Sequence, residues 1–229
     1  MNIMKNFKIY PCITGHRAID WQSQLEEINQ RKIKEVSVFV ERFDKKERPH
    51  LYKFLKESCI ERVPFVHLRD DTDVSDMKFF IDNFKTQHFN IHEEHFKILD
   101  NWKGYWDKLY LEMNYDGKVD KDVKVRQIGG FCIDLSHFKS TIARGGEEAE
   151  YIHQRKGKIN FACNHLNGYD PINMDDKHNV TDLKDFDYLT TLPKFVFSPI
   201  ISLEVDNSIK DQLEFKKYLD EMLGKYLVE

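Results

Sequence analysis

The chain has 229 residues, of which 41% are hydrophobic and 32% are charged, and its formal net charge is −4. This balance excludes a disordered chain, which would have too few apolar residues for a core. It also gives no overall basic footprint for non-specific nucleic-acid binding. No apolar run approaches the roughly 18–20 residues of a membrane helix, and the first residues lack the apolar region of a signal peptide. We therefore expect one domain over residues 1–229, located in the cytoplasm and without membrane contact.

The four cysteines, Cys12, Cys59, Cys132 and Cys163, lie far apart and form no C-x-x-C pair. Three of them lie in apolar, strand-like runs, where a free cysteine behaves as a small buried hydrophobic residue. A disulfide framework or a zinc knuckle would need paired spacing. We therefore expect reduced thiols, in keeping with the cytoplasm.

Short apolar runs rich in β-branched and aromatic residues recur along the chain, a pattern typical of buried strands. In chain order they are FKIYPCITGH, IKEVSVFVE, VPFVH, HFNIH, KLYLE, GGFCID, KINFACNH and IISLE. Each of these eight runs ends in a histidine, an aspartate or a glutamate. The end residues are His16, Glu41, His67, His92, Glu112, Asp134, His165 and Glu204.

Helical periodicity and helix-start residues occupy several of the stretches between these runs. The expected helices cover residues 20–31, 47–57, 75–84, 136–153 and 208–224. Strands that alternate with helices form a parallel sheet, and a TIM barrel has eight such units. We therefore predict a compact α/β protein of the (β/α)8 TIM-barrel class. The alternative is an open doubly wound sheet, but no glycine-rich dinucleotide loop follows the first run.

In a TIM barrel the carboxyl ends of the strands form one mouth, where the active site is built. The end residues would converge there, joined by His137 after the sixth run. Asp176 and His178 lie in the longest stretch without a predicted element, 167–184, and loops of that length are usually functional. Converging carboxylates cost free energy unless cations neutralise them. Nitrogen and oxygen ligands suit zinc, manganese or iron, so the sequence predicts a metal site.

Each of these residues alone has a simpler explanation. His67 or His92 could be a strand-end histidine bonded to a backbone carbonyl, and Glu112 or Glu204 could pair with a loop lysine. An aspartate such as Asp134 is also favourable near a helix N-terminus. The metal hypothesis rests on their joint occurrence. Six of the eight strand ends carry side chains that we assign as metal ligands, and they follow one another along the chain in the order that a shared metal site would need.

That order, with the motifs CIDLSHF, NHLNG and MDDKHN, resembles the endonuclease IV family of the xylose isomerase-like barrel superfamily. The resemblance extends from His16 to Glu204 and is strongest from Phe131 to His178. It implies a xylose isomerase-like TIM barrel that holds up to three zinc ions. By this resemblance the ligands are His67, His92 and Glu112 for the first ion, Glu112, Asp134, His165 and Glu204 for the second, and His137, Asp176 and His178 for the third.

The resemblance also implies a metal-dependent phosphodiester hydrolase, similar to apurinic/apyrimidinic endonucleases, with damaged DNA as a candidate substrate. Metal ions activate a water and stabilise the leaving oxygen, so no serine or cysteine nucleophile is needed. The candidate catalytic residues are Glu112, Glu204 and His137. The candidate substrate-binding residues are His16, Arg69, Asn167 and Lys177. We assign Glu41 to substrate contact or to support of the ligands, not to ligation.

Two other functions fit the same residues. Glu112, Asp134, His165 and Glu204 alone resemble the single-metal site of sugar isomerases and epimerases, in which two carboxylates move a proton on a small sugar. The ion there would be manganese or another divalent metal, and His137 would bind the substrate. That function leaves four residues without a role, so it ranks second; they are His67, His92, Asp176 and His178. A barrel without catalytic activity ranks third.

Overall fold

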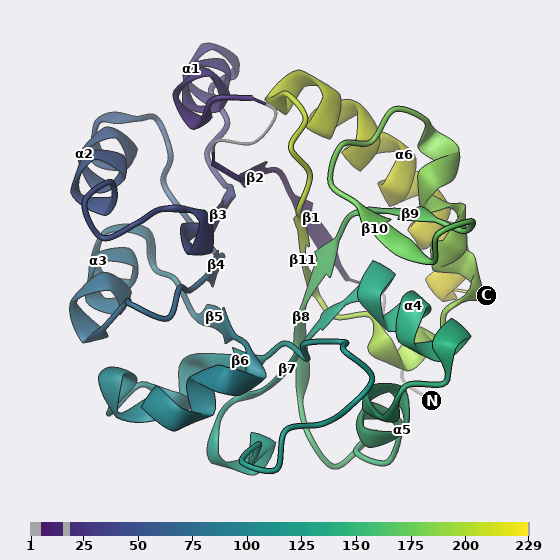
Figure 1. Ribbon diagram of the computed structural model, residues 1–229. Helices are drawn as coiled ribbons and strands as arrows, with labels where there is room; N and C mark the ends of the chain where they lie inside the picture. Colours follow the sequence, from purple (N-terminus) through teal and green to yellow (C-terminus); the bar gives the residue numbers. More distant parts are fainter. Residues whose placement is uncertain (1–5, 16–18, 229) are drawn as a thin grey trace.

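The computed structural model describes residues 6–15 and 19–228, and its centre is a nearly closed barrel of parallel strands (Figure 1). The sheet runs in the order β1-β11-β8-β7-β6-β5-β4-β3-β2, and all its pairs are parallel. Its strands are β1 Lys8–Tyr10, β2 Cys12–Ile13, β3 Ser37–Phe39, β4 Phe65–His67, β5 His88–Ile91, β6 Leu109–Leu111, β7 Gly130–Asp134, β8 Phe161–Leu166 and β11 Ile200–Leu203. The predicted α/β TIM barrel is confirmed.

The barrel closes through its first run, which the structure divides into two strands. β1 pairs with β11 at one end of the sheet, and β2 pairs with β3 at the other. Pro11 separates them, because proline has no N–H for a ladder bond. Its carbonyl still accepts a 2.9 Å hydrogen bond from the Ser37 backbone N–H. One extended segment therefore joins both ends of the sheet, and eight sequence runs give nine strands.

Helices surround the barrel on its outside (Figure 1). The α-helices are α1 Trp21–Arg31, α2 Arg48–Glu57, α3 Val74–Phe84, α4 Leu135–Arg144, α5 Glu147–His153 and α6 Ile209–Val228. Shorter 3-10 segments are η1 Val40–Arg42, η2 Glu93–Trp102, η3 Trp106–Lys108, η4 Val125–Gln127, η5 Leu183–Thr191 and η6 Lys194–Val196. Four of the five predicted helices are confirmed with small shifts of their ends. No helix in the described ranges is long and apolar enough to cross a membrane.

The fifth predicted helix, over residues 136–153, is wrong as a single element. α4 ends at Arg144 because Gly145 adopts a left-handed conformation with φ +70°. The backbone N–H groups of Gly145 and Gly146 then bond to carbonyls of the last helical turn, a common way for a helix to end at glycine. α5 begins after Gly146 as a separate short helix.

The stretch 167–184 contains more regular structure than its sequence predicts. β9 Gly168–Asp170 and β10 Asp175–Lys177 form an antiparallel hairpin, and η5 begins near the end of the stretch. The hairpin is tight at Gly168, where an added Cβ would lie 2.9 Å from a Val180 methyl carbon. The hairpin therefore gives Asp176 and His178 a fixed support beside the barrel.

The barrel interior below the mouth is filled by a layer of small and aromatic side chains. Side chains alternate along a strand, so residues two positions before a strand end point into the barrel like the end residue itself. Phe65, Tyr110, Cys132 and Cys163 each precede a predicted ligand by two positions and pack in one buried cluster. All four cysteines are free, as expected. This layer closes the barrel directly beneath the candidate ligands.

Candidate metal centre

Six predicted ligands lie at or next to the carboxyl ends of neighbouring strands, all at one end of the barrel. They are His67 at the end of β4, His92 after β5, Glu112 after β6, Asp134 at the end of β7, His165 near the end of β8 and Glu204 after β11. Five of the six are buried and His92 is half-buried. Apolar strands that end together thus carry these polar side chains into one enclosed region. With four other residues of the mouth, Glu41, His137, Asp176 and His178, they form three groups.

The first group consists of Glu41, His67 and His92. The Nε2 atoms of the two histidines lie 3.1 Å apart, and Glu41 Oε1 lies 3.8 Å from His92 Nε2. One ligand atom from each of the three lies within 4.8 Å of the others. Glu41 belongs to η1, the turn that follows β3. Glu112, in contrast, approaches the other nitrogen of His67, with 3.8 Å between its Oε2 atom and His67 Nδ1.

The second group consists of Glu112, Asp134, His165 and Glu204. Oxygens of its three carboxylates lie within 4.8 Å of one another. His165 lies between two of them, with Nε2 3.4 Å from Glu112 Oε2 and Nδ1 3.0 Å from Glu204 Oε2. Asn90 Nδ2 donates a 2.6 Å hydrogen bond to Glu112 Oε2 and so fixes that carboxylate. These are the four residues that the resemblance to endonuclease IV implies as ligands of one ion.

Asp134 is oriented by the start of α4. Its Oδ1 atom accepts hydrogen bonds from the Ser136 hydroxyl at 2.9 Å and from the His137 backbone N–H at 2.8 Å. Its Oδ2 atom accepts a 3.2 Å hydrogen bond from Asn167 Nδ2. An aspartate that caps a helix in this way is stabilised by the free N–H groups there. Asp134 therefore caps α4 and also belongs to the second group, because its carboxylate still lies within 4.8 Å of those of Glu112 and Glu204.

The third group consists of His137, Asp176 and His178. His178 Nε2 lies 2.6 Å from Asp176 Oδ2, and His137 Nε2 lies 4.0 Å from Asp176 Oδ1. The other nitrogen of His178 contacts the Glu204 backbone carbonyl at 2.9 Å, which joins this group to the second. The Tyr115 ring stacks on the His137 ring, with 5.4 Å between centroids and an interplanar angle of 11°.

Several buried ligand atoms have no hydrogen-bond partner within the described residues. They include His67 Nδ1 and His165 Nε2, whereas His165 Nδ1 and Glu204 Oε2 lack hydrogen-bond geometry but contact each other at 3.0 Å. A buried polar atom without a partner costs about 1–3 kcal/mol, and a divalent cation satisfies several such atoms at once. The donor set of imidazole nitrogens and carboxylate oxygens is that of zinc and manganese sites. The residues of the mouth therefore fit a metal centre.

Burial and neighbouring charges shift the pKa values of the mouth residues in both directions. Burial lowers the pKa of His67, and it lowers the pKa of His92 to about 4, so both imidazoles are neutral near pH 7. Neutral imidazole is the form that binds metals. Burial raises the pKa of Glu112 well above its usual value, against the opposing effect of His165. For Glu204 burial acts in the same direction, but the neighbouring His165 outweighs it and lowers the pKa to about 2.

The four predicted substrate-binding residues differ in their surroundings. Asn167 is fully buried, and its side-chain amide supports Asp134. Arg69 donates a 2.9 Å hydrogen bond to the Glu41 backbone carbonyl and so lies at the edge of the first group. Lys177 follows Asp176 and forms an ion pair of 2.7 Å with Asp185. His16 lies outside the described residues.

Two further residues of the mouth, Asn90 and Tyr115, were not expected there, and a third, Glu41, was expected only to contact substrate or support the ligands. Glu41 joins the first group, Asn90 bonds to Glu112, and Tyr115 covers His137. Asn90 could have been found from position alone, because it precedes His92 by two residues and so lies on the same side of the strand. The position of Glu41 at a strand end did place it at the mouth, but not in a ligand group. Tyr115 has no such signal, since it lies in a loop and adopts a positive φ of 54°.

No family model matches the chain, and no curated protein matches it. Solved structures are similar to it, at low sequence identity. A D-tagatose 3-epimerase-like protein matches with a TM-score of 0.50 and 15% identity over 96% of this chain and 98% of that chain. SacUVDE matches with a TM-score of 0.50 and 13% identity over 94% of this chain and 99% of that chain. These likenesses establish the fold, which is a TIM barrel.

Proposed function

We propose that this protein is a metal-dependent phosphodiester hydrolase that resembles endonuclease IV, with a site for up to three zinc ions at the mouth of the barrel. The observation that supports this function is the presence of two ligand groups beside the four-residue group that a single ion needs. One is the first group, in which the Nε2 atoms of His67 and His92 face each other. The other is the third group, in which Asp176 contacts His178. A single-metal enzyme has no use for either.

The chemistry of such a site follows from its charges. Bound divalent cations would acidify a water for attack on phosphorus and stabilise the negative charge of the leaving oxygen. Glu112 and Glu204 flank His165 and set the charge at the centre of the site. We assign them catalytic roles, together with His137, whose side chain is 33% exposed and therefore accessible to a substrate.

Cationic side chains at the rim would position the phosphodiester. Arg69 lies beside the first group and Lys177 beside the third, so together they bracket the ligands. A guanidinium can bind a phosphate through two parallel hydrogen bonds, whereas an ammonium acts as a compact charge. Damaged DNA is the proposed substrate, in keeping with the resemblance of the motifs CIDLSHF, NHLNG and MDDKHN to the endonuclease IV family.

The second candidate is a single-metal sugar isomerase or epimerase. It is favoured by the second group, whose oxygens from Glu112, Asp134 and Glu204 lie within 4.8 Å of one another. The similarity to a D-tagatose 3-epimerase-like protein also agrees with it. In this function Glu112 and Glu204 would move a proton beside the sugar carbonyl. A barrel without catalytic activity is the third possibility that the test below addresses.

The experiment that tests the proposal combines metal content with two assays. Protein purified without a histidine tag or chelator is analysed for metals, then assayed on an oligonucleotide with one abasic site and on a panel of ketoses. About three zinc ions per chain with strand cleavage would support the hydrolase. One manganese-like ion with ketose turnover would replace it by the isomerase. Absence of metal, with none taken up on titration, would contradict both enzymes.

A further inference from the structure

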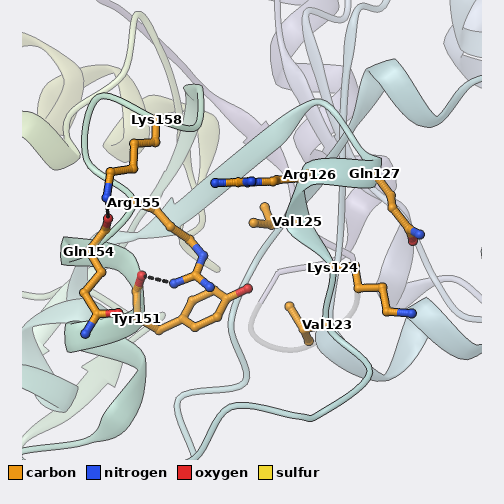
Figure 2. A pocket seen from close by; sticks show the side chains of 9 residues that line it. All are labelled: Val123, Lys124, Val125, Arg126, Gln127, Tyr151, Gln154, Arg155 and Lys158. Atoms are coloured by element: carbon orange, nitrogen blue, oxygen red, sulfur yellow. Dashed lines mark hydrogen bonds between the residues drawn. The ribbon is translucent and has the colours of Figure 1, made fainter.

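A cationic pocket of about 710 Å³ lies at the end of the barrel opposite the metal ligands. Two segments line it: residues 123–127, which lead into β7, and residues 151–158, which lead from α5 into β8 (Figure 2). The ligands Asp134 and His165 lie at the other ends of these same strands. Since a strand rises about 3.3 Å per residue, the length of β7 separates the pocket from the mouth by roughly 13 Å. The pocket is therefore a separate feature.

The lining of this pocket carries positive charge without neutralisation. Its cations are Lys124, Arg126, Arg155 and Lys158, and no described carboxylate lines it. None of the four forms an ion pair in the described part of the chain, although the chain has 39 acidic and 35 basic side chains. Other cations do find acidic partners, as Lys34 does with Glu61 at 2.9 Å. Like charges gathered in one place repel each other unless an anion joins them.

One cation of the pocket is held in a fixed position. The Arg155 guanidinium carbon lies 3.3 Å from the centroid of the Tyr151 ring, and its NH1 donates a 2.9 Å hydrogen bond to the Tyr151 carbonyl. Figure 2 shows Arg126 reaching from the opposite segment toward Arg155, while Lys124 points away. Lys158 donates to the Gln154 carbonyl at 3.1 Å, so its charge also has only a neutral partner.

These features define the chemistry of a ligand. A guanidinium offers a planar fork of donors that matches phosphate, and the cluster of cations suits a group with more than one negative charge. The volume lies within the roughly 300–1,000 Å³ of small-molecule sites. Arg126, Arg155 and Lys158 line one pocket and form no stripe, which a nucleic-acid strand would need. We propose that this pocket binds a small phosphorylated molecule, with its phosphate between Arg126 and Arg155 and near Lys158.

The test uses pyrophosphate as the probe and isothermal titration calorimetry at low ionic strength on the full chain with its metals. The variant carries Arg126→Gln and Lys158→Gln, two exposed positions whose change leaves the fold intact. Its control carries Lys53→Gln and Lys56→Gln on the exposed face of α2, which removes the same charge elsewhere. Hydrogen bonds to charged groups contribute about 1.5–3 kcal/mol each, so we expect the pocket variant to bind at least about tenfold more weakly. The control should bind like the unmodified protein.

The outcomes separate this pocket from the metal centre. Equal affinity of the two double variants for pyrophosphate would overturn the proposal, because any loss of binding would then come from the lower net charge and not from the pocket. Binding that a chelator abolishes and the pocket variant retains would also overturn it, since the anion would then occupy the mouth. Citrate binding as tight as pyrophosphate binding would contradict the preference for phosphate. Titration with adenosine monophosphate then distinguishes a nucleotide from a free phosphate as the source of the group.

Discussion

His67 and His92 face each other through their Nε2 atoms, which are only 3.1 Å apart. Burial keeps the pKa of both imidazoles below its usual value, so neither carries charge near pH 7. Two neutral imidazoles that point at one spot, with the Glu41 carboxylate 3.8 Å from His92, form a ready set of ligands for a divalent cation. Glu112 approaches the opposite nitrogen of His67, which is the usual place of a carboxylate that orients a metal-binding histidine.

Glu41→Gln is therefore expected to remove one metal position. The amide keeps the shape of the side chain but loses the charge that would complete the first group. We expect the metal content to fall by about one ion per chain relative to the unmodified protein, and loss of a supporting or ligating carboxylate to weaken that position at least about tenfold. Elemental analysis and competition with a chelator measure both quantities.

Glu94→Gln is the matched control for that change. Glu94 is an exposed glutamate of η2, next to the same mouth, and it belongs to none of the three groups. It should leave the metal content unchanged. If Glu41→Gln also left the metal content unchanged, Glu41 would not be the carboxylate ligand of the first group. Glu112 would then be the remaining candidate.

His178→Ala tests the third group. The change removes the imidazole that lies 2.6 Å from Asp176 and contacts the Glu204 carbonyl. We expect phosphodiester cleavage to fall by about a hundredfold to a thousandfold, since an electrostatic contact at a transition state contributes factors of this size. His153→Ala, an exposed histidine of α5, is the control. Full activity of His178→Ala would contradict the three-metal hypothesis and favour the isomerase.

The ion pair of Asp176 and His178 also predicts a pH dependence of stability in chelated protein. Burial alone would lower the pKa of His178, but the hydrogen bond with Asp176 outweighs it and raises the pKa to about 9. Burial alone would raise the pKa of Asp176, but the hydrogen bond with His178 outweighs it and lowers that pKa. The pair therefore stabilises the fold fully below the usual histidine pKa of 6.5, and this stabilisation is lost as the pH rises through 9. At low pH the stabilisation by the pair decreases as the pH falls below the usual aspartate pKa of 3.8, because Asp176 is then protonated.

Melting temperatures of chelated protein at pH 5 to 10 check this dependence. His178→Gln should melt below the unmodified protein near pH 6, by roughly 2–4 °C for each kcal/mol lost. The two curves should meet above pH 9. His153→Gln should lie close to the unmodified protein throughout. A His178→Gln deficit that stayed constant up to pH 10 would assign the loss to packing, not to charge.

The strands and their end residues could be predicted because burial leaves a strong local signal. A parallel strand enclosed on both faces is apolar throughout, so a histidine or carboxylate at the end of such a run is conspicuous. His67 and Asp134 end their strands as predicted, and Glu112 follows directly on β6. The closing of the barrel through Pro11 was less visible, since a single proline inside one apolar run gives two strands with different partners.

Side-chain direction and backbone breaks were harder to predict. Glu41 lies one residue into a 3-10 turn, and whether its carboxylate points to the mouth depends on that turn, which the sequence does not specify. The division of the predicted helix 136–153 depends on Gly145 in a left-handed conformation. A glycine inside a periodic pattern only lowers helix propensity by about 1 kcal/mol, so the pattern alone did not show the break.

Two glycines give opposite predictions for the same substitution by alanine. Gly130 begins β7 with φ +137°, and an added Cβ would lie 2.2 Å from the Asn160 carbonyl oxygen. Gly224 lies in α6, where an added Cβ meets nothing within 4 Å. Gly130→Ala should therefore lower the free energy of unfolding by at least about 2 kcal/mol, because it combines backbone strain with a steric clash. Gly224→Ala should raise it by about 0.5–1 kcal/mol, since alanine favours a helix. Urea denaturation of chelated protein measures both, and equal effects of the two substitutions would contradict the backbone geometry at the start of β7.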